Sequence, residues 1–179
     1  IMLCLINITI AQPAIQKQVD IGGTKGEALT GMIQASDNNF VLVGKTYSND
    51  FYVKKNHGDR DAWIVKLNET GDTLWTRVIG GDKVDEPHHV IEALDGSYMV
   101  VGETTSNTDD FNGMQKGIGD YWIANISSMG DINWIRTYGS NTGERCRSVA
   151  IAHGNTGYIL AGSTIGSNNG DVPANNGSW

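Results

Sequence analysis

The chain has 179 residues, which is enough to bury a substantial hydrophobic core. Its 13 Lys and Arg residues against 20 Asp and Glu residues give a formal net charge of −7, which argues against a nucleic-acid-binding surface because such surfaces need clustered basic residues. An acidic surface allows cation binding, although it more commonly serves only solubility. The 23 Gly and 3 Pro residues favour many tight turns with few rigid linkers.

The first segment, residues 1–11, predicts the end of a truncated signal peptide. It is an apolar run with Thr9 and Ala11 at the −3 and −1 positions of an acceptable cleavage site before Gln12. The run is too short to span a membrane, and its alternative interpretation is a buried first strand. Residues 12–21 form a lead-in segment. Cleavage would leave Cys146 as the remaining cysteine, so no disulfide within the chain is expected, which fits a bacterial exported protein.

A repeat of roughly 59 residues organises the rest of the chain. Gly22, Gly80 and Gly139 open successive copies at spacings of 58 and 59 residues. The copies cover residues 22–79, 80–138 and 139–179, so the chain holds about two and two thirds repeats, the third being incomplete. A fixed period of this order indicates a solenoid, a propeller or an array. Because residue 1 is Ile and the third copy stops short, we expect a piece of a longer protein.

Each copy contains short apolar runs bounded by Gly, Asn, Asp or Ser. In the second copy they lie around residues 90–91, 98–102, 120–124 and 133–134. Four such runs predict four antiparallel strands, and no helical periodicity appears beyond the N-terminus. The predicted fold is therefore all-β, a β-propeller fragment built of four-stranded antiparallel blades. A β-solenoid normally uses shorter coils, and a β-sandwich domain would need about 100 residues.

Tryptophan recurs at two positions of the repeat. The third run carries Trp63 in the first copy and Trp122 in the second, and the fourth run carries Trp75 and Trp134. A large aromatic side chain at the same position of successive units is well suited to packing between them. We therefore expect all four to belong to the core.

The second copy reads D-G-S-Y at 95–98, G-E-T-T-S at 102–106, D-Y-W-I at 120–123 and G-D-I-N-W at 130–134. This pattern resembles the long-period β-propeller repeats of secreted bacterial proteins, which often end in a sorting domain for type IX secretion. The resemblance covers residues 22–179 and implies architecture and a secreted or cell-surface location in a bacterium, but no particular activity. Residues 70–75 also resemble the docking segment of quinoprotein propellers. Without that motif's Lys and upstream Asp, no quinone cofactor is carried over.

The loops favour one face of the predicted propeller as the ligand face. The long second connections (residues 49–60, 107–119 and 168 onward) and the inter-blade links (80–86 and 139–144) should share that face, and long polar loops are often functional. The candidate ligand-face residues are Glu27, Asp85, Glu144, Asp59, Asp61, Asp110 and Asp120. The first three could ring a central channel. The competing interpretation, which also applies to Asp61 and Asp120, is that each carboxylate accepts backbone N–H groups of an adjacent loop.

No catalytic residue, cofactor or metal site is predicted. The loop acids Asp50, Asp59, Asp109, Asp110 and Asp171 offer oxygen ligands that suit Ca²⁺, but no segment has the spacing of a calcium-binding loop, so solvated turns are favoured. His88 and His89 align with Thr30-Gly31 and Arg147-Ser148, and adjacent strand residues point to opposite faces, so a shared ion is not expected. Cys146 follows no repeat pattern and is expected to be an inert thiol.

The expected function is that of a non-catalytic secreted or surface repeat module that binds a protein or glycan or serves as a scaffold, including in a surface array. The alternative is an extracellular polysaccharide hydrolase or lyase with carboxylates on the long-loop face. A catalytic site should break the repeat symmetry, whereas the acids here follow the repeat, which favours binding. The expected partners are an extracellular protein or glycan and the remaining blades of the same full-length chain, without nucleic acid or a membrane span.

Overall fold

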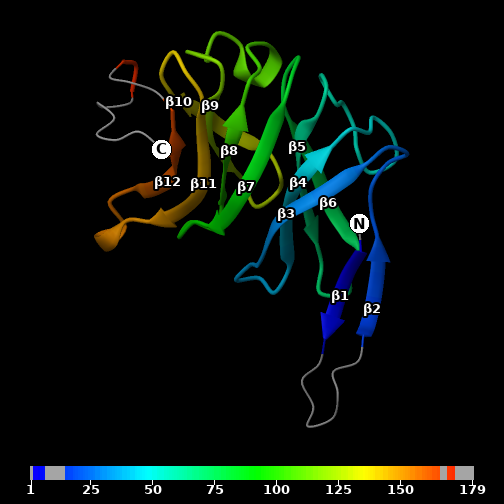
Figure 1. Cartoon of the computed structure of the whole chain (residues 1–179). Helices are drawn as coiled ribbons and strands as arrows, with labels where there is room; N and C mark the ends of the chain where they lie inside the picture. The colour runs from blue at the N-terminus through cyan, green and yellow to red at the C-terminus, as the bar shows by residue number, and fades with distance from the viewer. Residues whose placement is uncertain (1, 7–14, 166–168, 172–179) are drawn as a thin grey trace.

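The computed structural model of the chain describes residues 2–6, 15–165 and 169–171, and it is all-β over these residues (Figure 1). The strands are β1 (Met2–Ile6), β2 (Ile15–Asp20), β3 (Glu27–Gln34), β4 (Phe40–Thr46), β5 (Asp61–Leu67), β6 (Thr73–Ile79), β7 (Asp85–Glu92), β8 (Tyr98–Thr104), β9 (Asp120–Ile126), β10 (Ile132–Tyr138), β11 (Glu144–Ile151) and β12 (Tyr158–Thr164). Short 3-10 turns, η1 (Asp109–Phe111) and η2 (His153–Asn155), are the helical segments of this part of the chain. None of the described residues forms a helix that could cross a membrane.

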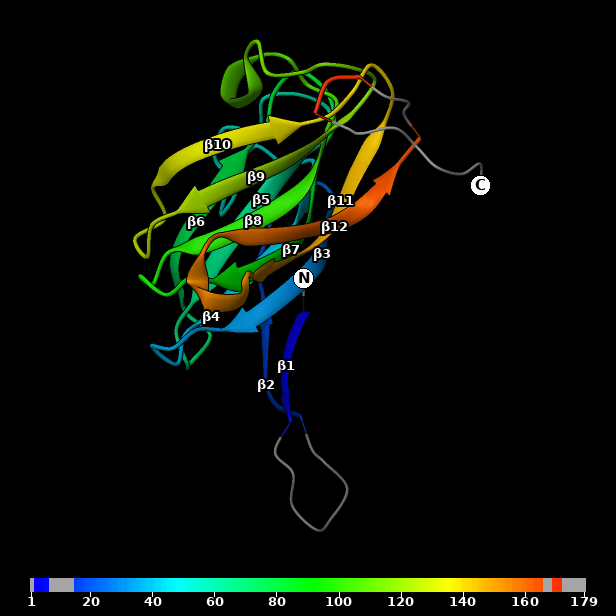
Figure 2. The same ribbon diagram turned by 90° about the vertical axis from the view of Figure 1, so that its left-hand side faces the viewer.

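The strands form antiparallel sheets that follow the repeat. The first unit is the open sheet β3-β4-β5-β6 and the second unit is the open sheet β7-β8-β9-β10, each ordered as in the sequence. In the third unit, β11 pairs with β12. The second sheet lies between the first sheet and the β11–β12 pair (Figures 1 and 2). The predicted four-stranded antiparallel arrangement is thus confirmed.

The main core lies between the first two sheets. Val41, Val43 and Ile64 of the first sheet pack in one buried cluster with Tyr98 and Val100 of the second. The two central strands of each sheet are buried on both faces. On the outer face of the first sheet, Leu42, Trp63 and Val65 pack in a second cluster with Ile21 and the loop residue Val53. Burial of β-branched and aromatic residues therefore holds successive units together as well as each unit internally.

A glycine ends the second run of every copy because the neighbouring strand bulges toward it. The pairing register of the first and second strands shifts in each unit, between Leu29 and Gly31 in the first. An added Cβ would lie close to a backbone oxygen of the bulged strand in all units: at 2.3 Å for Gly44, 1.9 Å for Gly102 and 2.0 Å for Gly162. No other residue fits these positions without moving the backbone.

The first two long loops and the inter-unit links share one edge of the described structure, as predicted, whereas most of the third loop lies outside the described residues. Arg60, at the end of the first long loop, forms a parallel bridge with Val84 of the following link, and Gly119 does the same with Gly143. The η1 turn of the second loop marks this edge at the top of Figure 1. Residues from loops far apart in sequence are therefore brought side by side there.

The β1–β2 pair precedes the first unit. Met2–Ile6 pair antiparallel with Ile15–Asp20, and the expected cleavage point after Ala11 lies outside the described residues, so the signal peptide stays a prediction. β2 leads into Gly22 as β6 leads into Gly80. Moreover, a Cβ on Gly71 of the first sheet would meet Val19 of β2 at 2.8 Å, as one on Gly130 of the second sheet would meet Trp75 of β6 at 2.7 Å. β2 therefore lies beside the turn between β5 and β6 of the first sheet, as β6 lies beside the turn between β9 and β10 of the second.

The tryptophans divide into two groups. Trp63 and Trp122 are fully buried, and Trp75 packs against the main core. The expectation of a core position does not hold for Trp134, whose surface is 37 % exposed. The reason is that the third unit contributes only β11 and β12 in the described residues, so the strands that would cover Trp134 are not among them.

Candidate functional site

The repeated acids at the start of the first strands hold their own links. The carboxylate of Asp85 accepts the backbone N–H of Gly81 at 2.7 Å. Glu27 accepts the N–H of Gly23 at 3.2 Å, and Glu144 accepts that of Ser140 at 2.9 Å. Each carboxylate also accepts the hydroxyl of the threonine that ends the second strand: Thr46, Thr104 or Thr164. The hydrogen bonds from the backbone of an adjacent link, which the sequence offered as the competing interpretation of these acids, are therefore present in every unit.

Asp61 and Asp120 occupy equivalent buried positions at the start of the third strands. One oxygen of Asp61 accepts the backbone N–H of His57 at 2.7 Å, and Asp120 does the same with Lys116 at 2.7 Å. The other oxygen of each has no hydrogen-bond partner among the described residues. Burial raises the pKa of both carboxyl groups, and it raises the pKa of Asp85 to about 6.

The loop acids also act on the links. Asp110 accepts the backbone N–H of Gly80 at 3.0 Å, and its own N–H donates to the Gly80 carbonyl at 3.2 Å. Asp50 accepts the N–H of Thr24 at 2.8 Å, and Asp171 that of Gly139 at 3.2 Å. Asp59 is exposed. Most of the predicted ligand-face acids therefore order the loops.

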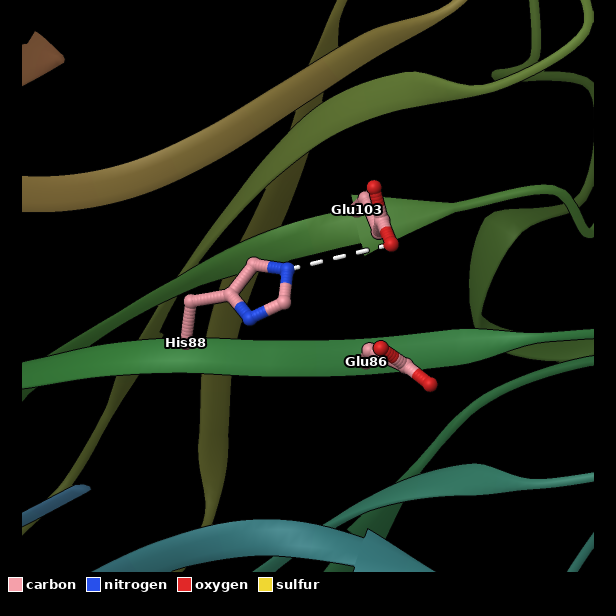
Figure 3. A group of neighbouring side chains, drawn as sticks. All are labelled: Glu86, His88 and Glu103. Carbon is pink, nitrogen blue, oxygen red and sulfur yellow. Dashed lines mark ion pairs between the residues drawn. The ribbon is translucent and has the colours of Figure 1, made fainter. Parts of the chain in front are cut away.

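A different group of charged residues gathers near the loop edge, and it breaks the repeat symmetry. Glu86 and His88 lie on β7 and Glu103 lies on the neighbouring β8, and the ring of His88 is directed toward Glu103 (Figure 3). His88 Nε2 is 3.8 Å from Glu103 Oε1, and one ligand atom of each residue lies within 4.8 Å of the others. Glu86 and Glu103 are directly paired across the two strands, which places them on the same side of the sheet.

Basic side chains from the first and third units surround this group. Lys45 Nζ and Arg60 Nε lie 2.9 and 2.6 Å from Glu86 Oε1. Arg145 Nε lies 2.8 Å from Glu103 Oε2, and Arg147 Nη1 lies 3.3 Å from His88 Nε2. Partial burial raises the pKa of the Glu86 carboxyl, but the hydrogen bonds from Lys45 and Arg60 outweigh it and leave this pKa below its ordinary value.

The charge balance of the cluster is positive. Lys45, Arg60, Arg145 and Arg147 carry four positive charges against the two carboxylates of Glu86 and Glu103. Glu86, His88 and Glu103 offer the atoms for a divalent cation, but such an ion would have to compete with four basic groups that already surround them. The cluster is chemically better suited to an anion.

A pocket opens beside the cluster on the loop edge. It has a volume of about 460 Å³, and Arg60, Glu103 and Arg145 contribute to its lining. Thr105 and Ser163 add hydroxyl groups, and the remaining wall comes from the links and long loops, with Val84, Ile118, Gly119, Gly143, Glu144 and Ile165. The side chain of Arg145 is 60 % exposed, so its guanidinium can present a second edge to a ligand.

Sequence reasoning did not single out Glu86, Glu103, Arg145 or Lys45 for this cluster. The sequence signal that could have identified the cluster is the change of charge at equivalent positions of the repeat. Ala28, Glu86 and Arg145 share one position, Lys45, Glu103 and Ser163 a second, and Thr30, His88 and Arg147 a third. Because the charge at these positions differs between copies, the fold of the unit does not require it, and in the structure these residues pair with charged residues of the neighbouring units.

Comparison with known proteins adds no family to these observations: no protein-family model matches the chain, and no curated protein is significantly similar to it in sequence.

Proposed function

We propose that this protein is a non-catalytic β-propeller repeat module of a secreted or cell-surface bacterial protein, and that it binds a ligand at the pocket on its loop edge. The single observation that carries the proposal is the division of charged residues into two groups. Acids that follow the repeat accept the backbone N–H groups of their links in every unit, whereas charged residues that differ between copies, namely Arg60, Glu103 and Arg145, line the pocket beside Glu144.

The propeller architecture extends the observed arrangement. Two open sheets of four antiparallel strands and a third strand pair pack in succession, and the loops gather at one edge. This arrangement supports a ring of blades in which the pocket faces the ligand side. Secretion, a cleaved signal peptide and type IX export rest on the apolar first segment and on the sequence resemblance.

The chemistry of the pocket favours a ligand with an anionic group. Arg60 and Arg145 line it together with Glu103 and Glu144, and the adjoining cluster adds Lys45, Arg147 and Glu86, so four basic groups face three carboxylates in a chain whose formal net charge is −7. Arginine binds carboxylates in a bidentate manner, and the hydroxyl groups of Thr105 and Ser163 can donate to further oxygens. A glycan that contains a uronic acid has a carboxylate for the arginines and hydroxyl oxygens for Thr105 and Ser163.

The hydrolase or lyase alternative has no comparable support. Glycoside hydrolysis requires an accessible general acid with a raised pKa. Asp85 has the raised pKa, about 6, but its side chain is fully buried and its oxygens bind Gly81, Thr104 and Ser106. Glu86 lies near the pocket, but basic neighbours lower its pKa.

The test is isothermal titration calorimetry of the protein with a trigalacturonate, with neutral maltotriose as the matched uncharged sugar. We expect saturable binding of the acidic sugar only, weakened at least tenfold by Arg145→Ala. Lys54→Ala is the control, because Lys54 is an exposed basic residue of the same loop edge outside the pocket. Binding that is equal for both sugars, absent for both, or unchanged in Arg145→Ala contradicts the proposed ligand chemistry. Release of reducing ends from the acidic sugar would support the enzyme instead.

A further inference from the structure

Glu103 is the pocket carboxylate whose basic partner a ligand can take away. Glu144, the other carboxylate of the lining, accepts hydrogen bonds from Ser140 and Thr142 within its own link. Glu103 instead pairs with Arg145, whose Nε lies 2.8 Å from Glu103 Oε2 and whose side chain is largely exposed. An anion that binds Arg145 therefore competes directly with Glu103 for the guanidinium group.

His88 faces the second oxygen of the same carboxylate. Its Nε2 is 3.8 Å from Glu103 Oε1, which is beyond hydrogen-bond distance, and the ring is directed toward that oxygen (Figure 3). The side chains of His88 and Glu103 are mostly shielded from water, at 9 and 14 % exposure. Glu103 is thus bound to Arg145 on one oxygen and lies within a small movement of His88 on the other.

The surroundings of the His88 ring pull in opposite directions. His88 is the residue of β7 that is left unpaired where the register with β8 shifts, and such bulges redirect side chains beside functional sites. The charged groups that face the ring are Glu86 from β7, Glu103 from β8 and Arg147 from β11, whose Nη1 lies 3.3 Å from Nε2. The two carboxylates favour a proton on the ring, whereas the guanidinium opposes it.

Glu86 is already balanced by the first unit. Lys45 Nζ and Arg60 Nε both lie within 3 Å of its Oε1. The charge that a ligand leaves without a partner is therefore that of Glu103. Histidine can supply the missing positive charge, because this residue type changes its charge between about pH 5 and pH 8.

We propose that the pocket takes up one proton together with its anionic ligand, and that His88 receives this proton. The ligand carboxylate pairs with Arg145, Glu103 moves from Arg145 to His88, and the protonated Nε2 donates to Glu103 Oε1. The proton comes from the solvent and forms an N–H bond on the ring. This inference rests on the proposed function, since it assigns the regulation of the same pocket. Ligand and proton promote each other's binding, so the affinity rises as the pH falls.

The experiment is isothermal titration calorimetry of the whole chain with trigalacturonate at pH 7.5, 6.5 and 5.5, a range in which the carboxylates of the sugar stay ionised. At pH 6.5 the titration is repeated in MES and in imidazole, because the different ionisation enthalpies of these buffers report protons taken up on binding. We expect at least fivefold tighter binding at pH 5.5 than at pH 7.5, with uptake of a fraction of one proton at pH 6.5.

Two variants identify the proton acceptor and the carboxylate. His88→Gln should abolish proton uptake and flatten the pH profile. Glu103→Gln should bind more tightly than the unchanged protein at pH 7.5 and equally at all three pH values, because a neutral amide needs no compensating charge. A gain in affinity cannot arise from misfolding. His153→Gln is the control, since His153 is an exposed histidine outside the pocket lining, and it should keep the profile of the unchanged protein.

The outcomes separate this inference from the proposed function. Binding that is independent of pH and takes up no proton overturns the inference but leaves the proposed ligand in place, whereas absence of binding at every pH overturns both. Proton uptake that persists in His88→Gln also overturns the inference, because another group must then receive the proton. Asp85, whose buried carboxyl has a pKa of about 6, would be examined for that role through Asp85→Asn.

Discussion

Asp85 accepts the backbone N–H of Gly81 at 2.7 Å from a fully buried position, so the acid that opens the strand also fixes the link that precedes it. Glu27 and Glu144 repeat this contact in the other units. The recurrence explains why an acidic residue stands at the same place in each copy. The shared hydrogen bond gives the carboxylate a structural role in each unit.

The buried Asp85 predicts a specific pH dependence of stability. Its pKa in the folded protein is about 6, raised by burial above the ordinary value of 3.8. Between these two values the folded state holds the proton more tightly than the unfolded state does, so the contribution of Asp85 to the free energy of unfolding falls as the pH rises from 4 to 6. The maximal slope is about 1.4 kcal/mol per pH unit.

Urea unfolding of the unchanged protein and of Asp85→Asn across this pH range measures the effect. Subtracting the free energy of unfolding of the variant from that of the unchanged protein cancels the contributions of other acids. Glu86 is one of them, and its lowered pKa makes stability rise with pH. We expect Asp85→Asn to be destabilising, because one amide cannot accept the hydrogen bonds of Gly81, Thr104 and Ser106 together, and more so at pH 4.5 than at pH 7. A difference that does not vary with pH would contradict the raised pKa.

The glycines that open the second and third copies should not tolerate a side chain. A Cβ at Gly80 would lie 2.2 Å from Asp61 Cγ, and one at Gly139 would lie 2.2 Å from Asp120 Oδ1. We expect Gly80→Ala and Gly139→Ala to lower the free energy of unfolding by about 3 kcal/mol, because each buried aspartate must be displaced. Gly119→Ala is the control, since its nearest contacts would be at 3.5 Å, and it should cost less than about 1 kcal/mol. Equal effects of all three changes would refute the close packing.

The two fourth-strand tryptophans should differ in their effect on stability. Trp75→Ala removes a ring that packs on the main core and a hydrogen bond to Ser128, so we expect a loss of about 3 kcal/mol in chemical denaturation. Trp134→Ala alters an exposed ring and should cost less than about 1 kcal/mol. Equal destabilisation of the two variants would contradict the exposure of Trp134 in the structure.

Cys146 should be unreactive in the folded protein. Its side chain is fully buried, and burial raises the pKa of the thiol to about 11. In a Cys4→Ser background, Ellman's reagent at pH 8 should label no thiol in buffer and one thiol in concentrated urea. Rapid labelling in buffer would show that the β11–β12 pair opens readily.

The repeat in the sequence was sufficient to predict the strands, their antiparallel order within each sheet and the shared edge of loops and links, because these depend on short-range spacing of apolar residues, glycines and turn residues. Gly44 and Gly102 illustrate this, since the backbone approach that requires them recurs in every unit. The role of Asp85 was one of two interpretations of the same pattern. Local sequence cannot distinguish a buried carboxylate from an exposed one when both follow the repeat.

The packing of one sheet on the next decided the remaining features. Arg60, Glu86 and Arg145 meet because three units converge at the loop edge, and no spacing along a single strand encodes that convergence. Trp75 and Trp134 have the same sequence surroundings but different exposure, because burial of a side chain depends on what lies across from it and not on its own strand. Sequence therefore determined the unit, and tertiary structure determined where a pocket forms and which of the equivalent tryptophans is buried.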